Sequence, residues 1–274
     1  MRIGEQAIRR TTNLGFTRVD MIHLKRVAHE LYCWISLLSI FPSYFYGGVP
    51  LFLFQTILGG GGACLCDWFI GPTMKNNISR ITANGHGGKQ KLLAQMYLTV
   101  LTSESILLSL AVFSGCFDAT LRCDACLLYH VAATLAFNEA VFTLVHRFFL
   151  HGTPAGARIH EIHHSCHPAS FSSGFIFHFL DSNMEFTFAH ICMASFSNWA
   201  FRDPFSLLVS LQLSYFFYVI DHSENLQLPH YWHHQWINAN YSAYTNVLLL
   251  KGKDYVRETL SLEKSRSKII SNKR

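Results

Sequence analysis

The stretch HRFFLHGTPAGARIHEIHH, residues 146–164, holds five histidines, and the stretch HYWHH, residues 230–234, repeats its ending. Residues three and four positions apart share one face of a helix, so each His-x-x-His-His block is expected to point its three imidazoles the same way. Neutral imidazole is the commonest metal ligand in proteins near neutral pH. Because one metal cannot use so many nitrogens, we predict a site for two metals. The ten candidate ligands are His146, His151, His160, His163, His164, His178, His222, His230, His233 and His234.

The spacing within the first stretch sets a condition on its helix. His146 and His151 are five residues apart, about 140° around an ideal helix. They converge only if the helix ends or bulges there, and Gly152-Thr-Pro154 supplies a stop. His151 is therefore expected at the C-terminus of a helix. Pro229 can open a helix at its first turn, which predicts a short helix that carries the third histidine block, residues 230–234. This helix is expected to present its imidazoles to the first block, residues 146–151, and to the second block, residues 160–164.

The composition indicates a bilayer around this histidine-rich region. Half of the 274 residues are hydrophobic and 14% are charged, against about a quarter in typical soluble domains. The net charge of +5 comes from basic residues in the two ends and in one segment rather than from a stripe. This pattern suits orientation against a membrane and does not favour nucleic-acid binding. The eight scattered cysteines are expected to be reduced structural thiols.

The apolar segments predict an all-α, polytopic membrane helical bundle with a cytosolic histidine-rich helical cap. Residues 92–117 and 127–145 are the clearest spans, and residues 186–200 and 205–220 are shorter. Glu104 and Glu139 interrupt the two clear spans, and charges at membrane depth usually face a bundle interior. The expected organisation is a basic cytosolic segment (1–30), membrane helices with a basic loop at 76–91 (31–125), the histidine-rich region (126–250) and a basic cytosolic tail (251–274).

Four polar residues outside the blocks have other expected roles, and one of them, Glu139, has two possible interpretations. Glu139 lies seven residues before His146 on the same helical face, so it is either a partner of the ligands or a carboxylate at the membrane edge. His167 is expected beside the ligands rather than among them. His130 and His190 are expected to be hydrogen-bonded core residues.

One rival motif overlaps the second block. His160-Glu161-Ile-His163-His164 also satisfies H-E-x-x-H, the zinc metalloprotease pattern in which the glutamate is the base. An intramembrane zinc metalloprotease is therefore the alternative. It leaves His146, His151, His230 and His233 without a role.

The combination of blocks resembles the fatty acid hydroxylase (sterol desaturase) superfamily of membrane di-iron oxidases over about residues 140–244. The matching elements are His146-x4-His151, His160-x-x-His163-His164, Asp221-His222 and His230-x-x-His233-His234. Phe177-His178-Phe-Leu-Asp181 is similar to the family's His-Pro-Leu-Glu element, with Phe179 for proline and Asp181 for glutamate. Asn240-Tyr241 is similar to another flanking element.

The resemblance implies an O2-dependent enzyme that hydroxylates or desaturates a lipid, whether sterol, fatty acyl chain or sphingoid base. It implies two iron ions, although imidazole also suits zinc. It also implies a multi-pass protein of the endoplasmic reticulum membrane, with its histidines facing the cytosol and with cytochrome b5 and its NAD(P)H reductase as electron donors. Glu139, Asp181, Asp221 and Asn240 are the expected residues around the ligands.

Overall fold

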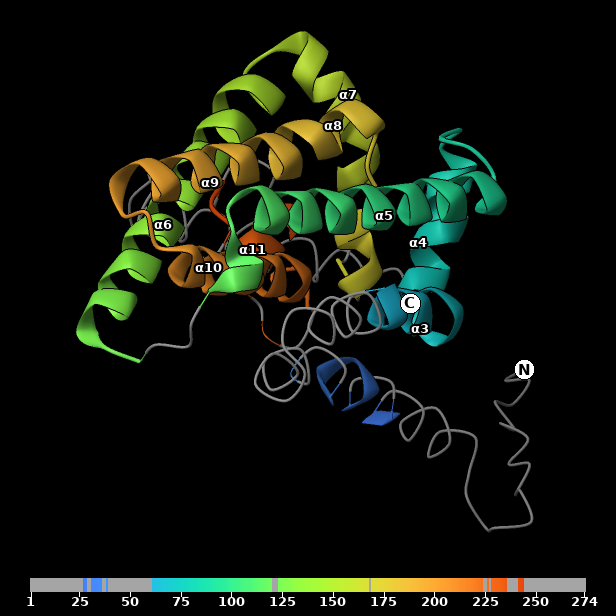
Figure 1. The fold of residues 1–274 in the computed structure, drawn as a ribbon. Helices are drawn as coiled ribbons and strands as arrows, with labels where there is room; N and C mark the ends of the chain where they lie inside the picture. The colour runs from blue at the N-terminus through green and yellow to red at the C-terminus, as the bar shows by residue number, and fades with distance from the viewer. Residues whose placement is uncertain are drawn as a thin grey trace, which may run out of the picture.

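The computed structural model describes residues 61–119, 123–167, 169–223, 228–235 and 241–243, together with residues 27–28, 31–35, 38 and 226. Within these ranges all the regular structure is helical (Figure 1). The elements are α3 (Gly62–Ile70), α4 (Pro72–Ala83), α5 (Lys89–Phe113), η2 (Cys116–Asp118), α6 (Ala125–Leu144), η3 (Val145–Leu150), α7 (Pro154–His164), η4 (Phe171–Phe175), α8 (Phe179–Ser182), η5 (Asn183–Phe188), α9 (Ala189–Ala200), α10 (Pro204–Ile220) and α11 (Pro229–Gln235). The elements η3 and η5 are π-helices, while η2 and η4 are 3-10 helices.

Two helices are long and apolar enough to cross a membrane. They are α5, with 25 residues, and the continuous helix formed by α6 and η3, with 26. Both carry large apolar side chains that face outward, including Leu101 (61% exposed), Phe113 (87%) and Leu128 (73%). Exposure on this scale suits a helix surrounded by lipid better than one surrounded by water. The prediction of long apolar helices at 92–117 and 127–145 is confirmed, while α9 and α10 are shorter.

Helix α6 packs against both α9 and α10, and polar side chains meet inside this bundle. The Asn138 amide donates to the Ser214 hydroxyl at 3.0 Å. Glu104 of α5 accepts a hydrogen bond from the Tyr215 hydroxyl of α10 at 2.5 Å. Both carboxylates that interrupt the apolar segments, Glu104 and Glu139, are buried. Both side chains therefore face the interior of the helical bundle.

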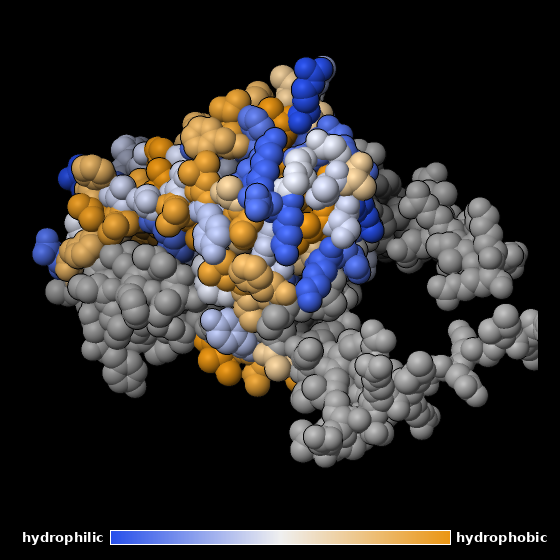
Figure 2. All heavy atoms as spheres, turned by 90° about the vertical axis from the view of Figure 1, so that its right-hand side faces the viewer, coloured by the Kyte–Doolittle hydropathy of each residue, from blue (hydrophilic) through white to orange (hydrophobic). Residues whose placement is uncertain are grey.

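The prediction of a basic loop at residues 76–91 is wrong for most of its length. Pro72 opens α4 at its first turn, and the helix continues to Ala83. Proline is well placed there because a first-turn residue needs no N–H partner. Only residues 84–88 connect α4 to α5. Figure 2 shows the side of the molecule that carries α3 and α4, where hydrophilic side chains gather in a band beside apolar ones.

Several predictions fall on other parts of the chain. The basic segment at 1–30, the start of the membrane-helix region as far as residue 60, Asn240 and the tail at 251–274 lie wholly or largely outside the described residues. Among the cysteines that the structure describes, seven are free thiols.

Candidate metal centre

The first histidine block meets the condition that its spacing set. Helix α6 widens into the π-helix η3, and the His151 N–H donates to the His146 carbonyl five residues earlier at 3.0 Å. The wider turn brings the two rings to one side, with centroids 4.9 Å apart. Helical structure ends at His151, as Gly152-Thr-Pro154 predicted. The block therefore both bulges and ends, and π-helical turns of this kind are frequent at functional sites.

The second block lies on α7, which packs directly against η3. The Thr153 hydroxyl caps α7 by accepting from the Gly156 N–H at 2.9 Å, and Pro154 fills the first turn. A Cβ atom at Gly156 would lie 2.0 Å from the Phe149 carbonyl oxygen. Only glycine therefore permits this approach, which sets His160 and His164 beside the first block.

The third block lies on a short helix that begins where the sequence predicted. Helix α11 opens at Pro229 and carries His230, His233 and His234. His222 follows the end of α10 and reaches the same region. The η4 turn packs on its ring, since a Cβ atom at Gly174 would lie 2.9 Å from His222 Nδ1.

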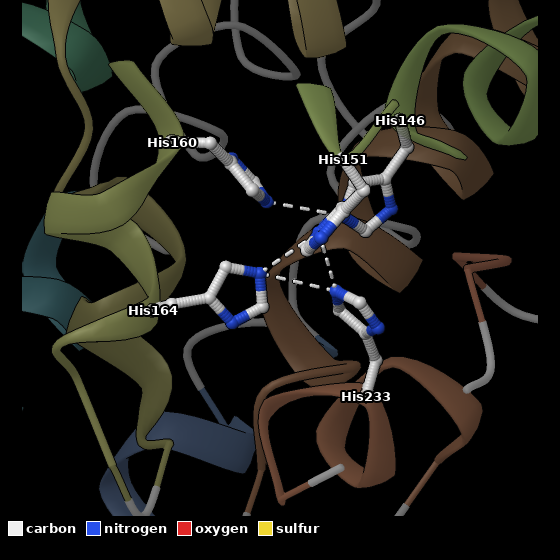
Figure 3. A group of neighbouring side chains, drawn as sticks. All are labelled: His146, His151, His160, His164 and His233. Atoms are coloured by element: carbon white, nitrogen blue, oxygen red, sulfur yellow. Dashed lines mark hydrogen bonds between the residues drawn. The ribbon is translucent and has the colours of Figure 1, made fainter. Parts of the chain in front are cut away.

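Nine of the ten candidate histidines meet in two neighbouring groups. The first histidine group consists of His146, His151, His160, His164 and His233, and the second consists of His163, His222, His230 and His234. Within each group, one ring nitrogen from each residue lies within 4.8 Å of all the others. Figure 3 shows the five rings of the first group pointing toward one another from three separate segments.

The expectation that each block points all its imidazoles one way is wrong. His160 and His164 enter the first group while His163 enters the second, and His233 is likewise separated from His230 and His234. Successive residues differ by about 100° around a helix axis. Adjacent histidines such as His163 and His164 therefore face different groups.

His178 lies outside both groups, so the structure does not bring it together with the other nine candidate ligands. The residue is exposed and stands just before α8, where its Nδ1 accepts from the Leu180 N–H at 3.3 Å. A residue that caps a helix turns its side chain toward the free N–H groups of the first turn. The ring of His178 is therefore used locally.

The predicted surrounding residues hold the rings in different ways. Both carboxylate oxygens of Asp181 lie 2.9–3.0 Å from His160 Nδ1. Asp221 lies against Nδ1 of the adjacent His222. Glu139 accepts from the Ala243 N–H at 3.2 Å, and the Tyr241 carbonyl two residues earlier accepts from His146 Nδ1 at 3.0 Å. Glu139 therefore reaches the first group through the 241–243 segment.

The other histidines behave as the sequence suggested. His167 Nδ1 donates to the His234 carbonyl at 2.9 Å, so it touches a member of the second group without joining it. His190 Nδ1 donates to the Phe186 carbonyl at 2.8 Å, and its Nε2 accepts from Ser214 at 3.1 Å. His130 pairs with Asp203 at 2.9 Å.

Two residues that sequence reasoning missed lie next to the first group. Glu185 is 1% exposed, and its Oε1 lies 3.6 Å from His146 Nε2. The Tyr218 hydroxyl donates to Glu185 Oε2 at 3.4 Å. Glu185 lies four residues after Asp181, which places both carboxylates on one helical face. That spacing was the available signal, although nothing in it shows that α8 and η5 reach the histidines.

Burial keeps the imidazoles neutral. It lowers the pKa of His151 to about 4, and it lowers the pKa values of His160, His163 and His164 well below the ordinary range. Mutual repulsion between neighbouring rings acts in the same direction. A neutral ring offers a nitrogen lone pair, which is the form that binds a metal.

The ring nitrogens make contacts that a cation would stabilise. A carbonyl only accepts, so the hydrogen of His146 lies on Nδ1 and its Nε2 carries a lone pair. Asp181 fixes the same tautomer in His160. The two Nε2 atoms nevertheless lie 3.1 Å apart. In the first group, His233 Nε2 lies 3.0 Å from His151 Nε2 and 3.1 Å from His164 Nε2.

These separations match the edges of a coordination shell. Two nitrogens bound at right angles with bonds of about 2.1 Å lie about 3.0 Å apart, whereas a tetrahedral angle gives about 3.4 Å. Five donors also exceed the four that structural zinc takes. The first histidine group therefore fits an ion that binds more than four ligands.

The charges around the two groups also favour bound metal ions. Glu139, Asp181, Glu185 and Asp221 are buried, and no lysine or arginine is buried among the described residues. Burial raises the pKa of Asp221 to about 6 and those of Asp181 and Glu185 well above their ordinary range. Two divalent cations would bring one positive charge for each of the four carboxylates, and charges buried together stabilise one another. The residues present fit two metal ions.

Comparison of the chain with family models, with curated proteins and with solved structures gives no match.

Proposed function

We propose that this chain is a membrane-bound, O2-dependent di-iron oxidoreductase that hydroxylates or desaturates a lipid. The observation that carries the proposal is the convergence of nine imidazoles into two neighbouring groups at the end of a helix that is apolar enough to cross a membrane. Two reduced irons bound there would supply the electrons that split O2 and the oxidising power to remove hydrogen from an unactivated C–H bond. No acid–base side chain attacks such a bond.

The chain's own part is to hold the rings and to exclude water. Asp181 orients His160, and the Tyr241 carbonyl orients His146. Orientation through the second ring nitrogen is the usual way in which proteins fix a metal-binding histidine. Phe177 stacks on His163 with ring centroids 4.0 Å apart and shields the second group.

The substrate would be a lipid, because the segments that carry the site present apolar side chains at the surface. Phe148 on η3 is 61% exposed, and Phe179 and Leu180 on α8 are 55% and 54% exposed. Phe171, Phe175 and Phe177, by contrast, are buried and pack in the core. We propose that a lipid approaches the site past Phe148 and Phe179.

The proposed setting is the endoplasmic reticulum membrane, with the histidine groups facing the cytosol. The support is the cluster of exposed basic residues on α4 and at the start of α5, namely Lys75, Arg80, Lys89 and Lys91, since lysine and arginine are enriched in cytosolic segments. Cytochrome b5 and its reductase are the proposed electron donors.

The test is untargeted lipid profiling of cells with and without the protein, repeated under low oxygen. We expect an oxygen-dependent gain of one class of hydroxylated or unsaturated lipid. Metal analysis of the purified protein should find about two equivalents of iron, because the donors form two groups. Lipid profiles that do not change in any class would refute the proposal.

The protease alternative has less support. Glu161 would have to act as the base beside a zinc ion held by His160 and His164, but its side chain is 65% exposed and lies 4.0 Å from His86. A single bound zinc, together with a peptidase activity that Glu161→Gln abolishes, would favour the protease instead.

A further inference from the structure

The Glu185 carboxylate lies beside the first histidine group with one oxygen unused. Its Oε1 is 3.6 Å from His146 Nε2 and 3.7 Å from His160 Nδ1. Its Oε2 accepts from the Tyr218 hydroxyl at 3.4 Å. Oε1 itself is buried and has no hydrogen-bond partner among the described residues. A buried acceptor without a partner is costly and needs an explanation.

Neither neighbouring histidine can donate a hydrogen bond to this oxygen. The Tyr241 carbonyl takes the Nδ1 hydrogen of His146, so the Nε2 atom that faces Glu185 carries a lone pair. Asp181 takes the Nδ1 hydrogen of His160. When Glu185 is ionised, its Oε1 and His146 Nε2 are therefore two acceptors that face each other, and a cation bound to both would turn their repulsion into attraction.

The distance between Glu185 and His146 allows a cation that these two residues share. Ligands of one ion with bonds of about 2.1 Å lie about 3.0 Å apart at right angles and about 4.2 Å apart across the ion. The separation of 3.6 Å between Glu185 Oε1 and His146 Nε2 falls between these limits. Glu185 reaches this position from the π-helix η5, just as His146 does from the π-helix η3.

We propose that Glu185 is a further metal ligand. Its Oε1 joins the ion held by the first histidine group, and Tyr218 is a positioning residue that holds the other oxygen. The inference rests on the two-metal centre of the proposed function. It gives the first group a mixed nitrogen and oxygen donor set of the kind that suits divalent iron or manganese, and it makes the two ions chemically different.

The chain contains a matched control for this arrangement. Tyr215, three residues before Tyr218 on α10, donates to the Glu104 carboxylate at 2.5 Å. Both members of this pair are buried, as are Tyr218 and Glu185. No histidine of either group is paired with Glu104 among the described contacts. The loss of a buried carboxylate that is held by a tyrosine can therefore be compared at two places. Glu185 lies beside the histidines, and Glu104 lies away from them.

The experiment measures Fe2+ binding to the full-length protein in detergent micelles, by anaerobic equilibrium dialysis with metal counting. In Glu185→Gln, one of the two sites should weaken at least about tenfold, since even residues outside the ligand shell change affinity by 10- to 100-fold, while the other site keeps its affinity. Tyr218→Phe should weaken the same site by less. Glu104→Gln and Tyr215→Phe should bind both ions as the wild type does.

A second measurement separates a ligand from a merely structural residue. Co2+ bound in place of iron absorbs visible light in bands that depend on its ligands. In Glu185→Gln, the bands of one of the two bound Co2+ ions should shift. In Glu104→Gln, the bands of both ions should stay unchanged. If Glu185→Gln loses its helical circular dichroism, it is not folded and cannot be used. Tyr218→Phe is then the variant that tests the inference, because it keeps the Glu185 carboxylate. An unchanged Co2+ spectrum and unchanged affinity in that folded variant would overturn the inference.

The outcomes also separate this inference from the proposed function. A wild-type chain that binds no metal removes both. A Glu185→Gln protein that holds two ions with wild-type affinity and an unchanged cobalt spectrum removes the ligand role of Glu185 and leaves the two-metal centre in place.

Discussion

His233 is the residue whose loss separates the two-metal centre from a single zinc site. Its Nε2 lies within 3.1 Å of both His151 and His164, which come from two other segments. His233→Ala should lower the metal content and abolish lipid oxidation, because it removes one donor from the first group. A zinc protease that uses His160 and His164 would tolerate the change.

The control at this scale is His190, another buried histidine. Its hydrogen bonds go to the Phe186 carbonyl and the Ser214 hydroxyl, away from both groups. His190→Ala should cost about 1–3 kcal/mol of stability, since it leaves a buried hydroxyl without its partner, but should retain about two equivalents of metal. Metal analysis and thermal unfolding of both variants check the pair. Full metal content and activity in His233→Ala would contradict the two-group arrangement.

At the level of single residues, the sequence predicted which histidines matter but not how they divide. Spacing identified eight of the nine residues that converge, because two His-x-x-His-His blocks in one chain are improbable by chance, and His222 was added as part of the family resemblance. Spacing could not assign His163 and His164 to different groups, since that depends on where α10 and α11 lie. His178 matched a family element, yet its ring caps α8. Glu185 was missed because its neighbours come from segments far along the chain.

Among the elements, the contact between α7 and η3 decides whether the first two blocks meet. Gly156→Ala would place a Cβ atom 2.0 Å from the Phe149 carbonyl, so α7 has to move. Alanine stabilises an isolated helix by about 1 kcal/mol over glycine, but the overpacking here should cost about 1–3 kcal/mol. We expect a lower unfolding temperature and a loss of bound metal.

Ala157→Ser is the matched control for that substitution, because Ala157 is exposed on the same turn of α7. It should leave both measurements close to the wild type. A Gly156→Ala protein with raised stability and full metal content would show that α7 does not need this approach to η3.

The elements themselves were partly predictable. Pro229 marked the start of α11 because a proline at the first turn gives up no hydrogen bond. Pro72 likewise follows the end of α3 at Ile70 and opens α4. The bulge in η3 followed from the five-residue spacing of His146 and His151. The π-helix η5 has no such mark, and its position follows only from packing.

For the whole molecule, the topology of α5 and α6 places the two ends of each apolar helix on opposite sides. Helix α5 begins at Lys89, close to α4, and α6 returns the chain to His146. Cys123 lies just before α6 and Cys126 lies in its first turn, at the end of α6 away from the histidines, and both are exposed. If the helices cross the membrane, these two thiols lie on the side opposite the histidines, which is the lumen in the proposed orientation.

Sealed microsomes test this arrangement with a membrane-impermeant maleimide. Cys123 and Cys126 should react only after the membrane is permeabilised, and a Cys123→Ser/Cys126→Ser protein gives the background from the other thiols. Ser79→Cys, at an exposed position on α4, should react in intact vesicles because α4 carries the basic residues expected on the cytosolic side. Labelling of Cys123 in intact vesicles would mean that α5 and α6 do not cross. The histidine groups would then lie on a protein that rests on the membrane, and a lipid would have to leave the bilayer to reach them.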